Sequence, residues 1–118
     1  TGGHYSFAHD SDTNRAFIKA YQGLYGSKIR PNFMAVGAYD GMAAIVQVAG
    51  KLPAAAGQRI GGERAMALFK GMKLDSPRGP IAIDADTRDI VQTYYIRRVE
   101  KKGAEYYSTE FDRLGGNR

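Results

Sequence analysis

The residues from Phe33 to Ala49 constrain the fold more than any other stretch, because they predict a helix that is apolar on nearly every side. Such a helix is normally buried against several neighbours. The helix also contains small residues that would let other backbones approach closely; they are Gly37, Ala38, Gly41, Ala43 and Ala44. The remaining sequence predicts few elements that could cover all of these sides. We therefore expect that the chain either associates with further copies of itself or belongs to a larger α/β protein.

The length and composition are those of one ordinary globular domain or less. The 118 residues are 43% hydrophobic and carry a formal net charge of +5, which is too apolar and too mixed in charge for a disordered chain. The most apolar stretch, Val36 to Ala49, is too short for a membrane span and is interrupted by Asp40 and Gln47. The sequence has no cysteine, which excludes disulfide scaffolds, thiol nucleophiles and cysteine-based zinc sites.

Ahead of the apolar helix, the sequence predicts a short strand and an amphipathic helix. Residues 5–8 have the composition of a β-strand. Ser11 or Asp12 can cap the helix that follows, and Gly26 lies where a helix C-cap belongs. The apolar face of that helix repeats at three- and four-residue spacing through Phe17, Ile18, Tyr21, Leu24 and Tyr25. Pro31 is well placed to open the apolar helix, because its missing N–H would have no partner in the first turn.

The stretch that follows the apolar helix predicts a loop and then a third helix. Residues 54–57 have the composition of a loop, and residues 58–62 continue it. The third helix would begin near Glu63. Its apolar face would carry Ala65, Leu68, Phe69 and Met72.

The last third of the chain predicts strands. Residues 79–84 alternate in the manner of a strand, and residues 90–101 and 105–111 are rich in β-branched and aromatic types. Gly103 can supply the positive φ that a short hairpin turn needs. Residues 114–118 have the composition of a frayed tail. The predicted fold class is therefore α/β, with helices followed by a strand and a C-terminal β-hairpin.

Two groups of residues have the chemistry of a catalytic site but not its arrangement. Ser6, His9 and Asp10 are the residue types of a hydrolase triad, yet no G-x-S-x-G turn positions the serine. His4 and His9 are five residues apart, which does not place them on one helix face as paired zinc ligands would be. Turn and surface roles explain these residues better, and we expect that the chain is not an enzyme.

An aspartate cluster near residue 85 invites a calcium interpretation. An EF-hand loop that began at Asp84 would need Gly at its sixth position and Glu at its twelfth, where the sequence has Asp89 and Tyr95. A polar turn over residues 85–88, with Asp side chains bonding nearby backbone N–H groups, explains the cluster more simply. We expect neither a metal site nor a cofactor.

The positive charge gathers in the predicted hairpin. Arg97, Arg98, Lys101 and Lys102 lie close together in the sequence, but successive residues of a strand point to opposite faces. Glu100 also interrupts the cluster. A solvated hairpin accounts for these residues, and we expect no nucleic acid as a partner.

Three stretches carry a resemblance to a known family. Residues 31–42 contain a Tyr-Asp-Gly sequence within the apolar helix, residues 69–80 end in Pro-Arg-Gly-Pro, and residues 83–100 follow as strands. In this order they resemble the type I periplasmic solute-binding proteins of ABC importers, the family of the leucine/isoleucine/valine-binding proteins. The resemblance covers nearly the whole chain.

The resemblance implies a fragment of a two-lobed fold, in which a ligand lies in the cleft between two α/β lobes that three crossovers join. This chain would be the C-terminal third of such a receptor. Residues 1–30 would supply a strand and helix of the second lobe, and residues 31–103 would return to the first lobe. Residues 104–118 would form a C-terminal strand and tail that lead back toward the second lobe.

The resemblance also implies a function. Such a receptor binds a small-molecule solute in the periplasm and presents it to the membrane permease of an ABC importer, with ligand contacts stabilising a hinge-closed state. The solute would be a branched-chain amino acid or a related small aliphatic or aromatic carboxylate. The alternative is a self-associating interaction module, a homo-oligomer that binds no ligand.

The resemblance places the start of the apolar helix near the ligand pocket, and the strand before the first helix close to a crossover. The candidate ligand-binding residues are Phe33, Met34, Tyr39, Tyr5 and Phe7. Core packing is the alternative role for each of them. Asp40 is expected to bond a hinge backbone or a neighbouring arginine rather than a ligand.

Overall fold

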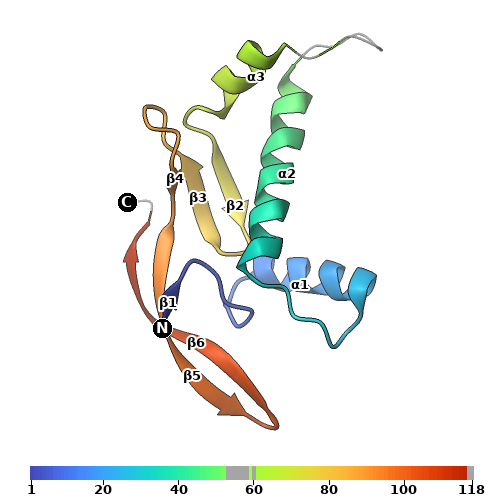
Figure 1. The fold of residues 1–118 in the computed structure, drawn as a ribbon, viewed down its shortest axis with the longest axis vertical. Coiled ribbons are helices and arrows are strands. Elements are labelled where there is room, and N and C mark those ends of the chain that lie inside the picture. Colours follow the sequence, from blue (N-terminus) through green and yellow to red (C-terminus); the bar gives the residue numbers. More distant parts are fainter. Residues whose placement is uncertain (53–58, 60, 117–118) are drawn as a thin grey trace.

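The computed structural model describes residues 1–52, 59 and 61–116. The described helices are α1 (Asp12–Tyr25), α2 (Phe33–Lys51) and α3 (Gly62–Phe69). The described strands are β1 (Gly2–Gly3), β2 (Lys73–Ser76), β3 (Gly79–Ile83), β4 (Ile90–Val91), β5 (Thr93–Lys102) and β6 (Glu105–Gly115). They form two antiparallel sheets with the strand orders β1-β5-β6 and β2-β3-β4 (Figure 1). The predicted α/β class is therefore confirmed.

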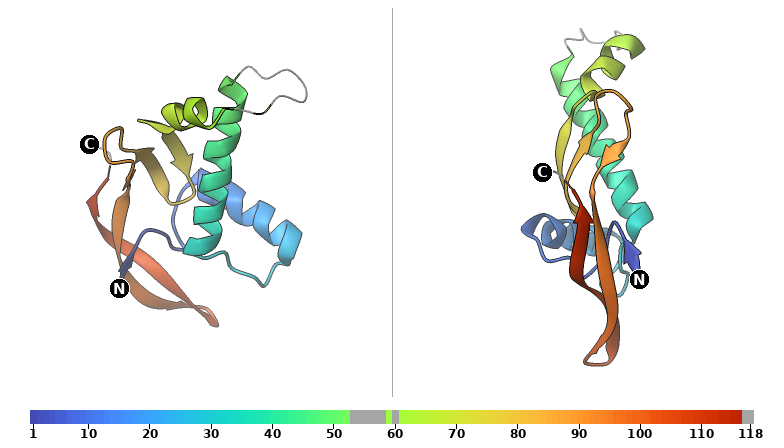
Figure 2. Two further views of the ribbon diagram at one scale, coloured as in Figure 1. Left: turned by 45° about the horizontal axis from the view of Figure 1, so that its top comes forward. Right: turned by 90° about the vertical axis from the view of Figure 1, so that its left-hand side faces the viewer.

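The molecule is long and thin, with principal extents of 53 × 33 × 19 Å. The two views of Figure 2 show helices beside the sheets rather than a closed layered body. The radius of gyration is 16.6 Å, whereas a compact domain of this length has a value of about 13.5 Å. The chain is thus more extended than a self-contained domain.

Helix α1 begins and ends where the sequence predicts. The Ser11 side chain accepts a hydrogen bond from the Asn14 N–H, which satisfies one of the free donors of the first turn. Gly26 ends the helix with φ +109° and donates its N–H to the Gln22 carbonyl. The strand expected over residues 5–8 is wrong, because the chain turns there: the His9 N–H donates to the Ser6 carbonyl. The preceding strand is β1, which pairs with β5.

Helix α2 confirms the long apolar helix, but its first residue differs from the prediction. Asn32 is the N-cap and accepts from the N–H groups of Met34 and Ala35, so Pro31 precedes the helix instead of opening it. One stripe of the helix is buried, at a spacing of four residues: Val36, Asp40, Ala44 and Val48. The larger apolar side chains on its other sides are exposed, namely Phe33, Met34, Tyr39, Met42, Ile45 and Val46.

By length and composition alone, α2 is also apolar enough to cross a membrane. Its buried stripe instead packs within this chain, where Ala44 and Val48 lie in one cluster with Met72. Asp40 in the same stripe accepts hydrogen bonds from Ser76 and Arg78. These are the contacts of a core helix in a globular fold.

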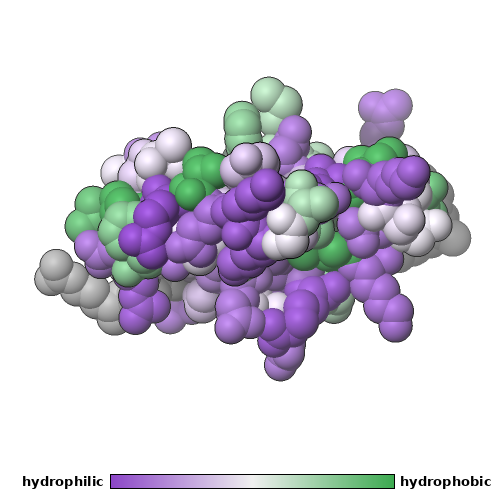
Figure 3. All heavy atoms as spheres, turned by 90° about the horizontal axis from the view of Figure 1, so that it is seen from below, coloured by the Kyte–Doolittle hydropathy of each residue, from purple (hydrophilic) through white to green (hydrophobic). Residues whose placement is uncertain are grey.

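Two small apolar clusters hold the fold together, and α2 contributes to both. The first consists of Tyr5, Phe17 and Val36 and joins α1 to the start of α2. The second consists of Ala44, Val48 and Met72 and joins the end of α2 to the third helix and its following strands. Met72 lies beyond the end of α3, not on its face as predicted, but it packs with the same residues. Seen from the hairpin end, hydrophilic residues cover most of the surface, and hydrophobic residues form separate patches among them (Figure 3).

The strands of the last third follow the prediction with three differences. The sequence analysis missed β2, which pairs with β3. The long strand expected over residues 90–101 divides at Gln92 into β4 and β5. Strand β6 continues to Gly115, with Leu114 opposite Tyr94, so the tail predicted over residues 114–118 is wrong for residues 114 and 115. The turn at Gly103 is confirmed, with φ +66°. The loop predicted over residues 54–57 lies outside the described residues, as do residues 58 and 60 of its continuation.

Candidate functional site

The two sheets meet at a junction that the chain crosses more than once. The upper part in Figure 1 holds α2, α3 and the β2-β3-β4 sheet, and the lower part holds α1 and the β1-β5-β6 sheet. Residues 26–32 lead from α1 to α2, and Gln92 alone separates β4 from β5. Side chains from elements far apart in the sequence therefore gather at this junction.

Three of the five predicted ligand-binding residues share one cavity. Tyr5, Phe7 and Phe33 line a hollow of about 260 Å³, together with Arg97 and Tyr107. Phe33 is 64% exposed, so its ring is available at the rim. An apolar wall with a few polar groups is the usual lining of a small-molecule site.

Phe7 makes aromatic contacts within this wall. Its ring stacks on Tyr107 with centroids 6.3 Å apart. The Arg30 guanidinium lies 5.0 Å from the Phe7 centroid and 4.2 Å from the Tyr107 centroid, and it also pairs with Glu105. These contacts attach the crossover before α2 to the β5–β6 hairpin.

Tyr5 lies at the base of the cavity and belongs to the core. Its side chain is buried, its ring packs edge-on against Phe17, and its hydroxyl donates to Asn14 Oδ1 at 2.8 Å. Burial raises the pKa of Tyr5 well above its usual value. Tyr5 is therefore a neutral hydrogen-bond donor at physiological pH.

Met34 and Tyr39 lie apart from that cavity. Met34 is 68% exposed at the start of α2. Tyr39 lines an apolar groove of about 410 Å³ between α1 and α2, where its ring contacts Phe17 at 4.9 Å between centroids. The structure thus brings together Tyr5, Phe7 and Phe33 and leaves the other two predicted residues outside the group.

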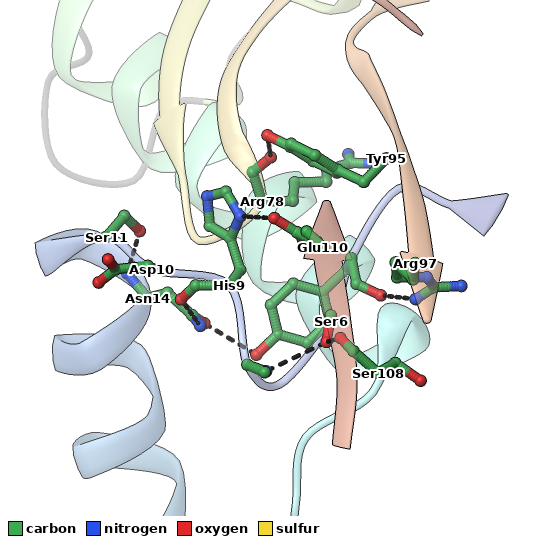
Figure 4. A network of polar contacts seen from close by, with 12 residues as sticks. Ser6, His9, Asp10, Ser11, Asn14, Arg78, Tyr95, Arg97, Ser108 and Glu110 are labelled. Atoms are coloured by element: carbon green, nitrogen blue, oxygen red, sulfur yellow. Dashed lines mark hydrogen bonds and ion pairs between the residues drawn. The ribbon is translucent and has the colours of Figure 1, made fainter. Parts of the chain in front are cut away.

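Asn14 organises the loop that carries Tyr5 and Phe7, and the sequence analysis missed it. The residue is fully buried and donates from Nδ2 to the Phe7 carbonyl at 3.3 Å and to the His9 carbonyl at 2.8 Å. Its Oδ1 accepts from Tyr5. Figure 4 shows Asn14 and His9. Asn14 precedes Phe17 by three residues, so it lies on the apolar face of α1, and a polar residue at such a position is the signal that would have found it.

A second cavity of about 530 Å³ lies at the junction of the sheets, with His9, Tyr95 and Glu110 among its lining residues. His9 Nδ1 is 2.7 Å from Glu110 Oε2, and both side chains are largely buried. The Tyr95 ring lies 5.0 Å from the His9 ring (Figure 4). This arrangement can position a polar group of a ligand, and the sequence analysis did not predict the partnership.

The residues of the supposed triad have separate partners. Ser6 Oγ donates to the Ser108 carbonyl at 2.6 Å, His9 pairs with Glu110, and Asp10 pairs with Arg15. The turn role expected for these residues agrees with the hydrogen bond from the His9 N–H to the Ser6 carbonyl, and Asp10 lies at the surface. The surface role expected for Ser6 and His9 is wrong, because Ser6 is buried and the His9 side chain is largely buried.

The basic residues of the hairpin do not form one surface. The Arg97 guanidinium donates to the carbonyls of Tyr5, at 2.6 Å, and Gly2, at 2.9 Å. Arg98 instead pairs with Glu100. The Arg97 guanidinium therefore holds the N-terminal segment against β5.

Asp40 confirms the expectation of an arginine partner. Its Oδ2 accepts from Ser76 Oγ at 2.8 Å and from Arg78 Nε at 2.9 Å. Burial raises the pKa of Asp40, and the bonds from Ser76 and Arg78 oppose that shift. Arg78 itself was not foreseen, because it lies 38 residues away in the sequence.

The aspartate cluster forms the predicted polar turn. Asp84 Oδ1 accepts from the N–H groups of Asp86 and Thr87, and these two bonds lower the pKa of Asp84. Within the described residues, no group of three or more His, Asp or Glu side chains is arranged to hold a metal ion.

Comparisons with known proteins agree with the resemblance found in the sequence. A family model described as periplasmic binding protein matches residues 1–104. A curated relative, the Leu/Ile/Val-binding protein homolog 6 of Brucella abortus (strain 2308), is 39% identical over 108 residues, which are 91% of this chain and 27% of the relative.

Two solved structures are similar over the whole chain. One is a solute-binding protein of an ABC transporter from Rhodopseudomonas palustris BisB5, in complex with 3,4-dihydroxybenzoic acid, with 45% identity and a TM-score of 0.87. The other comes from R. palustris HaA2, in complex with p-hydroxybenzoic acid, with 32% identity and a TM-score of 0.86. This chain covers 31% of each.

The chain thus spans less than a third of the length of the relatives it matches. The match nevertheless extends over nearly all of this chain and includes the type I periplasmic-binding-protein fold that the sequence predicted. The chain belongs to the periplasmic binding protein family, whose members bind solutes for ABC transporters.

Proposed function

We propose that this chain is the C-terminal part of a periplasmic receptor that binds a small carboxylic acid and presents it to the permease of an ABC importer. The observation that carries the proposal is the 45% identity, over the whole chain, to a solute-binding protein in complex with 3,4-dihydroxybenzoic acid. The Brucella relative is named for leucine, isoleucine and valine, so the solute class includes aliphatic as well as aromatic acids.

The cavity around Phe7 supports an apolar solute. Phe7 and Phe33 would face the aromatic or aliphatic body of the acid, and Tyr5 would support them from the core. Among the described residues, the charged groups of the lining are mostly engaged already. Arg30 pairs with Glu105, and Arg97 donates from its two Nη atoms to the carbonyls of Tyr5 and Gly2, which leaves its buried Nε without a partner. The carboxylate of the solute would therefore be held by residues of the receptor that this sequence does not include.

We further propose a division of the chain between the two lobes. The part with α2, α3 and the β2-β3-β4 sheet would belong to the first lobe, and α1 with the β1-β5-β6 sheet to the second. The pairing of β5 with both β1 and β6 supports a return to the second lobe at Gln92, earlier than residue 103. Solute contacts on both lobes would then stabilise the closed receptor.

A chimera tests the proposal. The 31% of the R. palustris BisB5 protein that this chain matches is exchanged for residues 1–118, and binding is measured by isothermal titration calorimetry. We expect the chimera to bind 3,4-dihydroxybenzoate or 4-hydroxybenzoate, and titration with leucine places the solute on the aromatic or the aliphatic side of the class. A folded chimera that binds none of these acids would contradict the proposal.

The isolated 118-residue chain is the control for that experiment. It should show no calorimetric signal with leucine or benzoate, because the groups that hold the carboxylate are absent from it. Binding by the isolated chain at millimolar or lower concentration would show that the site is complete without the rest of a receptor.

A further inference from the structure

The two sheets are joined along one strand by a single residue. Strand β4 belongs to the β2-β3-β4 sheet and ends at Val91, and β5 belongs to the β1-β5-β6 sheet and begins at Thr93. Gln92 lies between them. Rotation of one sheet against the other must therefore change backbone angles at or beside Gln92, since hinge movements are absorbed by a few residues at the ends of elements.

Arg78, in the turn between β2 and β3, holds this crossing residue. Its Nη1 donates to Gln92 Oε1 at 2.5 Å, while its Nε donates to Asp40 Oδ2 at 2.9 Å. Its backbone carbonyl accepts from the Tyr95 hydroxyl on β5 at 2.8 Å. One residue thus contacts α2, the crossing point and the first part of β5 (Figure 4 labels Arg78 and Tyr95).

The two hydrogen bonds of the Arg78 side chain differ in strength. The bond to Asp40 is part of a buried ion pair, in which the Arg78 side chain is 14% exposed and the Asp40 side chain 7%. Ser76 adds a second hydrogen bond to the same carboxylate oxygen. Breaking such a pair leaves a buried charge without compensation. The hydrogen bond to Gln92 joins the guanidinium to a neutral amide, so breaking it costs less free energy than breaking the ion pair. Arg78 is therefore fixed to the β2-β3-β4 part and reaches across to the crossing residue.

We propose that Arg78 is a positioning residue that sets the angle between the two sheets through its hydrogen bond to Gln92. The Asp40 pair holds the guanidinium in the direction that this bond requires. The bond restricts the backbone at the crossing and so narrows the range of angles that the sheets adopt. The next step rests on the proposed function. In such a receptor, the same hydrogen bond would shift the equilibrium between the open and closed arrangements of the lobes.

The absence of cysteine in the sequence makes a direct test possible. Lys73→Cys and Val99→Cys place one nitroxide label on an exposed position of each sheet, on β2 and on β5. Pulsed electron–electron double resonance then measures the distance between the labels in the full 118-residue chain, diluted with unlabelled chain so that only pairs within one molecule contribute. We expect one narrow distribution in the labelled parent and a broadened or displaced one after Gln92→Ala.

Gln22→Ala is the matched control. Gln22 is half-buried like Gln92, and its side chain also makes one hydrogen bond, to the Ile29 carbonyl, but it lies in α1 away from the crossing. Gln22→Ala should leave the distribution unchanged. Gln92→Glu keeps an acceptor for Arg78 and should restore the narrow distribution, which a merely structural role for the residue would not require.

Arg78→Lys provides a second route if Gln92→Ala does not fold. Lysine keeps the positive charge beside Asp40 but lacks the planar fork that serves two partners at once, so it should broaden the distribution. The proposal is overturned if both Gln92→Ala and Arg78→Lys fold and give the parent distribution. No solute is present in this test, so its outcome does not depend on the proposed receptor function, which the unmodified chimera tests separately.

Discussion

Asn14 shows how much of the loop geometry depends on one side chain. It satisfies the Tyr5 hydroxyl and the carbonyls of Phe7 and His9, all close to the cavity. A buried polar group that loses its partner keeps its desolvation cost without compensation. The conformation of residues 5–9 therefore depends on this amide.

Asn14→Ala should lower the free energy of unfolding by about 1–3 kcal/mol, because it leaves buried polar groups unpaired. Urea unfolding followed by circular dichroism measures the change. Asn32→Ala is the matched control, since Asn32 is exposed and caps α2; loss of a cap costs about 1 kcal/mol. Equal losses in both variants would argue against a special role for Asn14.

Asp40 gives the chain a specific pH dependence. Burial raises its pKa above the usual 3.8, so the folded state holds the Asp40 proton more tightly than the unfolded state does. This contribution to stability is fully present below pH 3.8 and is lost as the pH rises through the folded-state pKa. Relative to Asp40→Asn, the parent should gain stability as the pH falls from 7 toward 4.

Urea unfolding of both proteins at a series of pH values measures that difference, and subtraction removes the titration of all other groups. A parent that loses stability relative to Asp40→Asn on acidification would mean that the Arg78 contact outweighs burial.

At the scale of elements, α2 is an apolar helix of which this chain buries only one side. Its buried stripe repeats every four residues from Val36 to Val48, while Met42 and Val46 on other sides are exposed. The helix was predicted in type and nearly in length from its apolar content. The identity of the buried stripe was not predictable, because a helix that is apolar all round does not indicate which side its own chain covers.

Val48→Ala should lower the free energy of unfolding by about 2 kcal/mol, from two lost methyl groups and the cavity left behind. Val46→Ala should change it by less than about 0.5 kcal/mol, since exposed positions contribute little. Val48 is 3% exposed and Val46 is 63% exposed. Comparing the same substitution at these two positions of one helix therefore isolates the effect of burial. Equal effects in a urea titration would contradict the burial pattern.

The strands illustrate a different limit of prediction. The hairpin turn at Gly103 follows from local chemistry, and its positive φ is observed. Strand β2 was missed because Lys73 to Ser76 lack β-branched residues; its conformation comes from pairing with β3 and from Met72 in the second cluster. Residues 5–8 were predicted as a strand from their β propensity but form a turn, because the Ser6 and Asn14 hydrogen bonds favour the turn.

At the scale of the whole molecule, the exposed side of α2 is the prominent feature. Exposed apolar patches of this kind are typical of surfaces that another polypeptide covers. In a receptor of the proposed function, the remaining polypeptide of the two lobes would cover it. The isolated chain lacks that cover, which keeps the self-associating alternative open for the chain alone.

The isolated chain should therefore self-associate with rising concentration. Multi-angle light scattering measures the mass, and Val46→Lys should shift it toward the monomer because a charge is costly in an apolar contact. Lys19→Glu on the exposed part of α1 is the control for a general effect of charge. A monomeric parent at all concentrations would exclude the self-associating module.

The sequence by itself determined the three helices, the C-terminal hairpin and the family, because these depend on local periodicity, caps, turns and ordered motifs. Only the tertiary structure decided the partners: Asn14 with Tyr5, His9 with Glu110, and Asp40 with Arg78. These pairs are 9, 101 and 38 residues apart, and such contacts form through packing of whole elements. No local pattern along the chain encodes which of several polar residues will meet.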